Sequence, residues 1–190
     1  MTIAIESQLM TTEELLAMPE DGVGRELIRG ELRERGLTRR NPMHSRAEAA
    51  IAALLRFWLK MQPAPRGQVL SGEAGFLIRK DPDTTVGIDV AYISSETAAA
   101  NAQSRVLIDG VPVLAVEICS PSDKQEDMLE KVTEYLKAGV KLVWVVEPIF
   151  RTVCVYRPDA PPVMFNDTQE ISGEPHLPGF RAAVAEMFGI

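Results

Sequence analysis

The chain has 190 residues, 46% of them hydrophobic and 25% charged, and its formal net charge is −7. This length and composition predict one domain with a full core, spanning residues 1–190. A membrane-spanning protein is not expected, because no apolar run approaches the roughly 18 residues that a spanning helix needs. The N-terminus also lacks the pattern of an export signal. We therefore expect a cytoplasmic protein with no membrane partner.

The N-terminal part of the chain predicts a short helix, a hairpin and a long helix. Thr11–Met18 has the composition and flanking turn residues of the short helix. Polar and apolar residues alternate over Arg25–Arg35 around Gly30, which predicts the hairpin. Apolar residues recur at helical spacing over Pro42–Met61, which predicts the long helix.

The rest of the chain predicts a series of strands interrupted by a second long helix. Ser122 is the expected cap of that helix, which ends at Gly139. The last two of the expected strands are predicted to pair antiparallel, and a terminal helix is expected from Arg181, after a short strand near Ile171. The expected strands lie at 68–78, 88–93, 113–118, 142–147 and 152–156. This alternation predicts an α/β fold with a mixed sheet.

Two acidic residues interrupt apolar, strand-like runs. Asp89 lies within Val86–Ile93, and Glu117 lies within Val111–Cys119. Burying a lone carboxylate costs several kcal/mol unless a metal, a proton or a partner compensates. The two carboxylates and a carbonyl such as that of Ile118 would supply the hard oxygen ligands that Mg²⁺ or Mn²⁺ prefers. The residues alone leave open a structural alternative, in which an arginine and a backbone donor satisfy the two acids.

A lysine on the helix after Glu117 extends this set. Asp127, Lys131 and Tyr135 recur every four residues and therefore share one helix face. If the helix packs on the sheet, Lys131 can reach the carboxylates, where an ammonium would offset charge that develops on a phosphate. The alternative is an ion pair between Asp127 and Lys131 on a solvated face.

Positive charge is concentrated in one segment of this acidic chain. Between Arg25 and Arg46 there are seven arginines and three glutamates, a net charge of +4, which leaves −11 for the rest. Affinity for nucleic-acid phosphates comes from Lys and Arg, so the segment permits a DNA partner. A solvated hairpin with ordinary surface arginines is the alternative.

The two cysteines, Cys119 and Cys154, both lie in apolar, strand-like runs. They are predicted to be reduced and buried rather than joined in a disulfide. A thiol enzyme centred on Cys119 is a further interpretation, and the absence of a histidine nearby in the sequence disfavours it.

Five motifs, taken in chain order, resemble one known family. The motifs are Glu26–Leu32, Ile88–Tyr92, Val116–Asp123, Lys131–Val140 and Val143–Pro148. Together they are similar to the Uma-two family of putative endonucleases, which belongs to the PD-(D/E)XK nuclease superfamily. The resemblance runs from about Thr11 to Tyr156 and onward to the C-terminus.

The resemblance implies a restriction-endonuclease-like core, in which helices flank a central mixed β-sheet. It also implies that Asp89 and Glu117 bind Mg²⁺ or Mn²⁺ for phosphodiester hydrolysis, and that Glu26 can complete the metal shell. The chain departs from the usual motif, because the position two residues after the glutamate is Cys119 rather than lysine. Lys131 on the following helix matches the displaced lysine of this family.

The function expected from this resemblance is metal-assisted hydrolysis of DNA. The catalytic residues would be Asp89, Glu117, Lys131 and Glu26, and the metal would be held by Asp89, Glu117 and Ile118. A homodimer is expected, because cutting both strands of a duplex commonly takes two active sites. The alternative is an inactive protein that kept the nuclease fold for binding or assembly, which the net acidity and the missing lysine at 119 favour.

Overall fold

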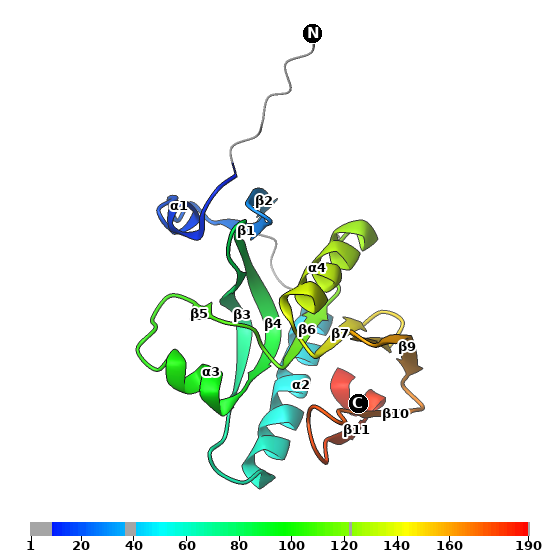
Figure 1. Ribbon diagram of the computed structural model, residues 1–190. Helices are drawn as coiled ribbons and strands as arrows, with labels where there is room; N and C mark the ends of the chain where they lie inside the picture. The colour runs from blue at the N-terminus through cyan, green and yellow to red at the C-terminus, as the bar shows by residue number, and fades with distance from the viewer. Residues whose placement is uncertain (1–8, 37–40, 122, 190) are drawn as a thin grey trace.

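The computed structural model describes residues 9–36, 41–121 and 123–189. Within them, nine strands form one mixed sheet in the order β2-β1-β4-β6-β7-β8-β9, with β3 paired to β4 and β5 paired to β3 (Figure 1). The strands of this sheet are β1 (Val23–Ile28), β2 (Glu31–Gly36), β3 (Gln68–Arg79), β4 (Thr84–Ile93), β5 (Ile108–Asp109), β6 (Leu114–Ile118), β7 (Leu142–Glu147), β8 (Thr152–Arg157) and β9 (Ala160–Asn166).

Helices and a small second sheet complete the described fold. The helices are α1 (Thr12–Leu16), α2 (Pro42–Met61), α3 (Ser95–Ala100) and α4 (Gln125–Ala138). A two-stranded sheet, β10 (Glu170–Ser172) with β11 (Arg181–Ala183), precedes the 3₁₀-helix η1 (Val184–Phe188). None of the described helices is long and apolar enough to cross a membrane.

Two hydrophobic cores lie against the large sheet. In one of them, α2 and the C-terminal segment contribute Leu55, Trp58 and Phe180, which pack with Trp144 of β7. In the other, α4 packs on strands that include β4 and β6. These are the two strands that carry Asp89 and Glu117. Figure 1 shows α4 and α2 separated by the sheet strands between them. Helix α4 is thereby held against the middle of the sheet.

The β1–β2 hairpin projects from the edge of the sheet. Its two strands pair along their full length, whereas within the described residues β1 pairs with β4 at a single position, Leu27 with Thr85. Its turn residues, Arg29 and Gly30, both have positive φ angles, of 54° and 76°. Two positive φ angles match a type I′ turn, whose twist suits a hairpin. The predicted hairpin around Gly30 is confirmed.

Most predicted elements are present, and the C-terminal helix is not. The long helix has the predicted bounds, with Asn41 as N-cap and Pro42 in its first turn. The helix predicted from Arg181 is wrong, because Arg181–Ala183 is a strand that pairs with β10, and only a single 3₁₀ segment follows. Helix α4 has Lys124 at its N-cap rather than Ser122, and Ser122 lies outside the described residues.

Three elements were not predicted from the sequence: α3, β5 and β9. Strand β9 contains Pro161 and Pro162, which cannot donate hydrogen bonds to a sheet ladder. It forms nonetheless because it is an edge strand, paired only with β8. Strand β5 is two residues long and is too short to leave a periodic signal.

Gly67 lies immediately before β3, where the backbone approaches the end of β4. A Cβ atom there would be 1.9 Å from the carbonyl oxygen of Ile93 and 2.8 Å from the ring of Tyr92. Because the backbone cannot yield freely, Gly67→Ala should lower the free energy of unfolding by about 3 kcal/mol in urea denaturation. Gly75→Ala is the control, since its Cβ would make an ordinary 3.4 Å contact with Leu107. Equal losses in the two variants would contradict this account.

Candidate active site

Asp89 and Glu117 lie on neighbouring antiparallel strands. The β4–β6 ladder pairs Val90 with Val116, and the two acids are the next residues beyond this pair, Asp89 on β4 and Glu117 on β6. Oδ2 of Asp89 accepts a hydrogen bond of 2.8 Å from the backbone N–H of Ile118. Both acidic residues are buried, with relative exposures of 5% and 4%. The prediction of two buried acids in adjacent core strands is confirmed.

Helix α4 places two polar side chains on the Glu117 carboxylate. Nζ of Lys131 lies 3.2 Å from it, and the hydroxyl of Tyr135 donates to it at 2.5 Å. These two residues are four apart, so one face of α4 presents both to β6. Lys131 is itself only 3% exposed. The structure therefore places the sequence-predicted lysine in contact with the motif glutamate.

Glu26 of β1 brings a third carboxylate to the same ammonium group. Its Oε1 lies 3.0 Å from Nζ of Lys131 and accepts the backbone N–H of Gly87 at 3.0 Å. Lys131 also donates to the carbonyl oxygen of Gly87, at 3.2 Å. Four elements, β1, β4, β6 and α4, thus converge on one small volume. Of the predicted catalytic residues, Lys131 thus contacts both Glu26 and Glu117.

Burial is the largest influence on the pKa values of Glu117 and Tyr135. The pKa of Glu117 is raised from 4.5 to about 7: burial is the largest cause, the Lys131 ammonium opposes it, and the nearby acids Asp89 and Glu26 add to it. Burial also raises the pKa of Tyr135 well above its ordinary value, with the Glu117 charge acting in the same direction. Tyr135 therefore remains a hydrogen-bond donor at neutral pH.

The raised pKa of Glu117 predicts a pH dependence of stability. A carboxyl with a folded-state pKa of about 7, above its ordinary 4.5, binds its proton more tightly when the chain is folded. This contribution is complete below about pH 4.5 and is lost as the pH rises through about 7, by roughly 3 kcal/mol. Urea denaturation with a chelator present should show this loss in wild type and not in Glu117→Gln. Equal pH dependences of the two proteins would contradict it.

The donor set of the cluster suits a hard divalent cation. Asp89, Glu117 and Glu26 offer carboxylate oxygens, the type of ligand that Mg²⁺ and Mn²⁺ prefer. Fully ionised, these three acids carry more negative charge than the single Lys131 can neutralise, and the high pKa of Glu117 is one expression of that excess. Within the described ranges, no three acidic, histidine or cysteine side chains are already grouped closely enough to enclose an ion. Binding would therefore require the carboxylates to turn from their present partners.

Two residues beside the acids were not among the predicted catalytic set. Tyr135 was noted only for its place on the lysine face of α4, and its hydroxyl in fact contacts Glu117. His44 of α2 is fully buried, with Nε2 3.4 Å from Oδ2 of Asp89. Helical spacing was a signal for Tyr135. No spacing pattern in the sequence pointed to His44.

Cys119 does not have the properties of a catalytic thiol. Both cysteines are free and half-buried, so the prediction that they form no disulfide is confirmed and full burial is not. Burial, with Glu147 as the next cause, raises the pKa of Cys119 to about 12. A thiolate is the nucleophilic form, and this environment disfavours it.

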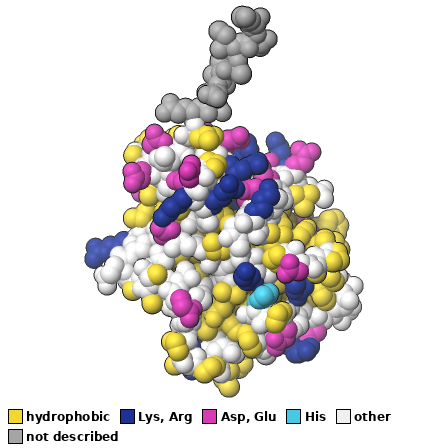
Figure 2. Space-filling model, in the orientation of Figure 1, with side chains coloured by type: hydrophobic (Ala, Val, Ile, Leu, Met, Phe, Trp, Pro, Cys, Tyr) yellow, Lys and Arg dark blue, Asp and Glu magenta, His cyan; other side chains and the backbone are white. Residues whose placement is uncertain are grey.

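The hairpin and α4 enclose a cavity next to the cluster. This hairpin cavity has a volume of about 180 Å³. Figure 2 shows basic and acidic side chains intermixed over the part of the surface where the hairpin and α4 lie in Figure 1. The cavity connects this charged surface to Glu26 and Lys131. Its lining residues are Glu26, Ile28, Leu32, Arg33, Glu34, Asp127, Glu130 and Lys131.

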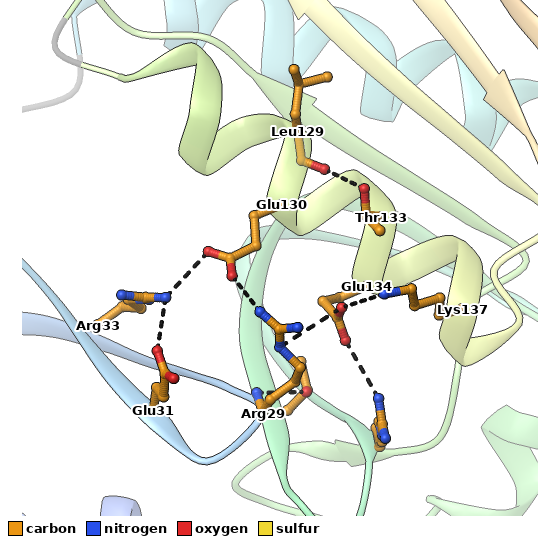
Figure 3. Close-up of polar contacts among 10 residues, drawn as sticks. Arg29, Glu31, Arg33, Leu129, Glu130, Thr133, Glu134 and Lys137 are labelled. Carbon is orange, nitrogen blue, oxygen red and sulfur yellow. Dashed lines mark hydrogen bonds and ion pairs between the residues drawn. The ribbon is translucent and has the colours of Figure 1, made fainter. Parts of the chain in front are cut away.

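Ion pairs tie the hairpin to α4 (Figure 3). Glu130 lies 2.8 Å from Nη2 of Arg29 and 3.3 Å from Nη2 of Arg33. Nε of Arg29 is also 3.9 Å from the buried Glu134, and Arg33 also pairs with Glu31. From the sequence, these arginines were expected to permit a DNA partner, with ordinary surface residues of a solvated hairpin as the alternative. Arg39 and Arg40 of the same segment lie outside the described residues.

The chain is similar to known proteins over most of its length. A family model described as "Uma2: Putative restriction endonuclease" matches residues 12–185. No curated protein matches the sequence. The crystal structure of a "putative nuclease belonging to DUF820" from Anabaena variabilis ATCC 29413 shares the fold, with a TM-score of 0.78 and 18% identity over 95% of this chain and 98% of that one.

These comparisons confirm the resemblance and the fold inferred from the motifs. The structural match supports the restriction-endonuclease-like arrangement of a mixed sheet flanked by helices. The family description supports a nuclease-like function. Since the family model covers most of the sequence, the chain belongs to the Uma2 family, described as putative restriction endonucleases.

Proposed function

We propose that the protein is a Mg²⁺- or Mn²⁺-dependent endonuclease that hydrolyses phosphodiester bonds in DNA. The single observation that carries this proposal is the position of Lys131, whose ammonium lies 3.0 Å from Glu26 and 3.2 Å from Glu117. A lysine beside metal-binding carboxylates is suited to phosphate chemistry, because it places a fixed positive charge where negative charge develops. The family description supports the nuclease class.

In this mechanism the acidic residues and Lys131 have separate roles. Asp89, Glu117 and the carbonyl of Ile118 would hold the metal, with Glu26 as a ligand or an outer partner. When bound, the ion would supply Lewis-acid activation of the phosphate and of the attacking water. Lys131 would orient that water or stabilise the developing phosphate charge. The N–H of Ile118 donates to Oδ2 of Asp89 at 2.8 Å, and this is one of the present contacts that would have to rearrange when the ion binds.

A cleavage assay on single- and double-stranded DNA tests the proposal. Wild type should cut with Mg²⁺ or Mn²⁺ and stop cutting when a chelator is added, and Asp89→Ala and Lys131→Ala should not cut. Asp109→Ala and Lys137→Ala are matched controls, since both residues are exposed and pair away from the cluster. Equal cleavage by all five proteins would show contamination or a misplaced site, and no cleavage by wild type would contradict the proposal.

A further inference from the structure

Glu130 bridges two arginines through different oxygens of one carboxylate. Oε1 accepts from Nη2 of Arg29 at 2.8 Å, and Oε2 accepts from Nη2 of Arg33 at 3.3 Å (Figure 3). The arginines come from the turn of the hairpin and from β2, whereas the acid comes from α4. Two guanidinium groups on two oxygens of one anion is also how arginines bind the non-bridging oxygens of a phosphodiester.

This bridge lies at the entrance to the proposed catalytic centre. Arg33 and Glu130 line the hairpin cavity together with Glu26 and Lys131. Glu130 directly precedes Lys131 on α4. A phosphate held by the two arginines would therefore lie beside the phosphodiester that is proposed to be hydrolysed at the acidic residues.

The bridge is accessible enough to be displaced. The side chains of Arg29 and Arg33 are each 46% exposed, and that of Glu130 is 29% exposed. Exposed ion pairs of this type are individually weak and are screened by salt. A polyanion brings higher charge and releases counterions when it binds, so it can compete successfully with one carboxylate.

We propose that Arg29 and Arg33 form a binding site for a nucleic-acid phosphate next to the scissile one, and that Glu130 occupies this site until substrate arrives. The proposal rests on the nuclease function proposed above. It explains why Arg29 and Arg33, which line the way to the proposed catalytic residues, are paired with an acid in the absence of substrate. Glu130 acts here as an internal substitute for phosphate, and binding exchanges one anion for another.

Equilibrium binding of an uncleaved DNA duplex, in the presence of a chelator, tests the exchange. Glu130→Gln removes the competing anion, and at about 50 mM salt its affinity should be about three- to tenfold higher than that of Glu126→Gln. Glu126 is the matched control, because it is an exposed acid on the same helix and its loss changes the net charge equally. Comparison with this control separates loss of the competitor from a general gain in positive charge.

The arginines are tested by the salt dependence of the same binding. Replacing both Arg29 and Arg33 with Gln should lower the affinity and reduce the slope of log affinity against log salt by about two units. Lys80→Gln with Arg105→Gln removes two exposed cations elsewhere and should leave the slope nearly unchanged. A thermal melt of each variant identifies any that fails to fold, and the single variant Arg33→Gln then gives the same test with a change of about one unit.

The outcomes distinguish this inference from the proposed function. If wild type binds and cleaves DNA but Glu130→Gln binds no tighter than Glu126→Gln, the exchange is wrong and the nuclease assignment stands. If Glu130→Gln binds DNA more weakly than that control, the Glu130 carboxylate only holds the hairpin in position. That result also contradicts the proposed exchange of Glu130 for phosphate. If wild type neither binds nor cleaves DNA, both proposals fail.

Discussion

Replacing Lys131 with methionine should lower the rate of DNA cleavage by about 10²–10³-fold in single-turnover assays with Mn²⁺. The substitution keeps most of the side-chain volume and removes the ammonium that contacts both Glu26 and Glu117. The loss should appear in the rate of the chemical step more than in DNA affinity, because Lys131 is only 3% exposed. Lys137→Met, on the same helix but directed to Glu134, should cleave like wild type.

The same substitution should also destabilise the fold. Without the ammonium, buried carboxylates face one another uncompensated, which typically costs about 3–5 kcal/mol. Part of that cost should be recovered as the pH falls and Glu117 takes up a proton. Because the Lys131 ammonium lowers the pKa of Glu117, its loss should move this gain in stability to a higher pH than in wild type. Undiminished cleavage by a folded Lys131→Met protein would remove the lysine from the mechanism.

Replacing Glu117 with glutamine should abolish both metal binding and cleavage, with a loss of more than about 10³-fold in rate. The amide keeps the size of the side chain and can still accept a hydrogen bond from Tyr135, so the fold should survive. It cannot supply the charge that a hard cation requires. Because burial raises the pKa of Glu117, this variant resembles the protonated form that wild type adopts as the pH falls.

Calorimetry with Mn²⁺ measures this effect directly. Wild type should bind more tightly as the pH rises towards 7 and above, because the ion competes with the proton on Glu117. Glu117→Gln should show no such binding at any of these pH values, whereas Glu96→Gln, a change of an exposed acid on α3, should behave like wild type. Millimolar Mn²⁺ without heat of binding to folded wild type would favour the inactive-scaffold alternative.

Asp89, Glu117 and Lys131 were predictable because each stands out in its local sequence pattern. Asp89 and Glu117 are polar residues in apolar strands, and Lys131 shares a helical face with Tyr135. The resemblance added Glu26, which no periodicity singles out. Its contact with Lys131 depends on how the hairpin folds back over α4, a long-range arrangement that neither local pattern contains.

The features that escaped prediction depend on tertiary contacts. Arg181–Ala183 forms a strand rather than a helix, because pairing with β10 satisfies its backbone hydrogen bonds. The acidic partner of Arg29 and Arg33 lies about 100 positions away, at separations of 101 and 97 residues. The distribution of charge along the sequence identifies the basic segment, but it does not show that Glu130 pairs with Arg29 and Arg33.

Anomalous diffraction from crystals soaked in Mn²⁺ tests the central claim most directly. The account predicts one ion bridging Asp89 and Glu117, with the amine of Lys131 within about 4–6 Å of a water on that ion, as expected for a group acting through an ordered water. The Tyr135 hydroxyl or the Lys131 ammonium should have released the Glu117 oxygen that binds the ion. An ion bound elsewhere, with the Lys131 contacts to Glu26 and Glu117 unchanged, would contradict the claim.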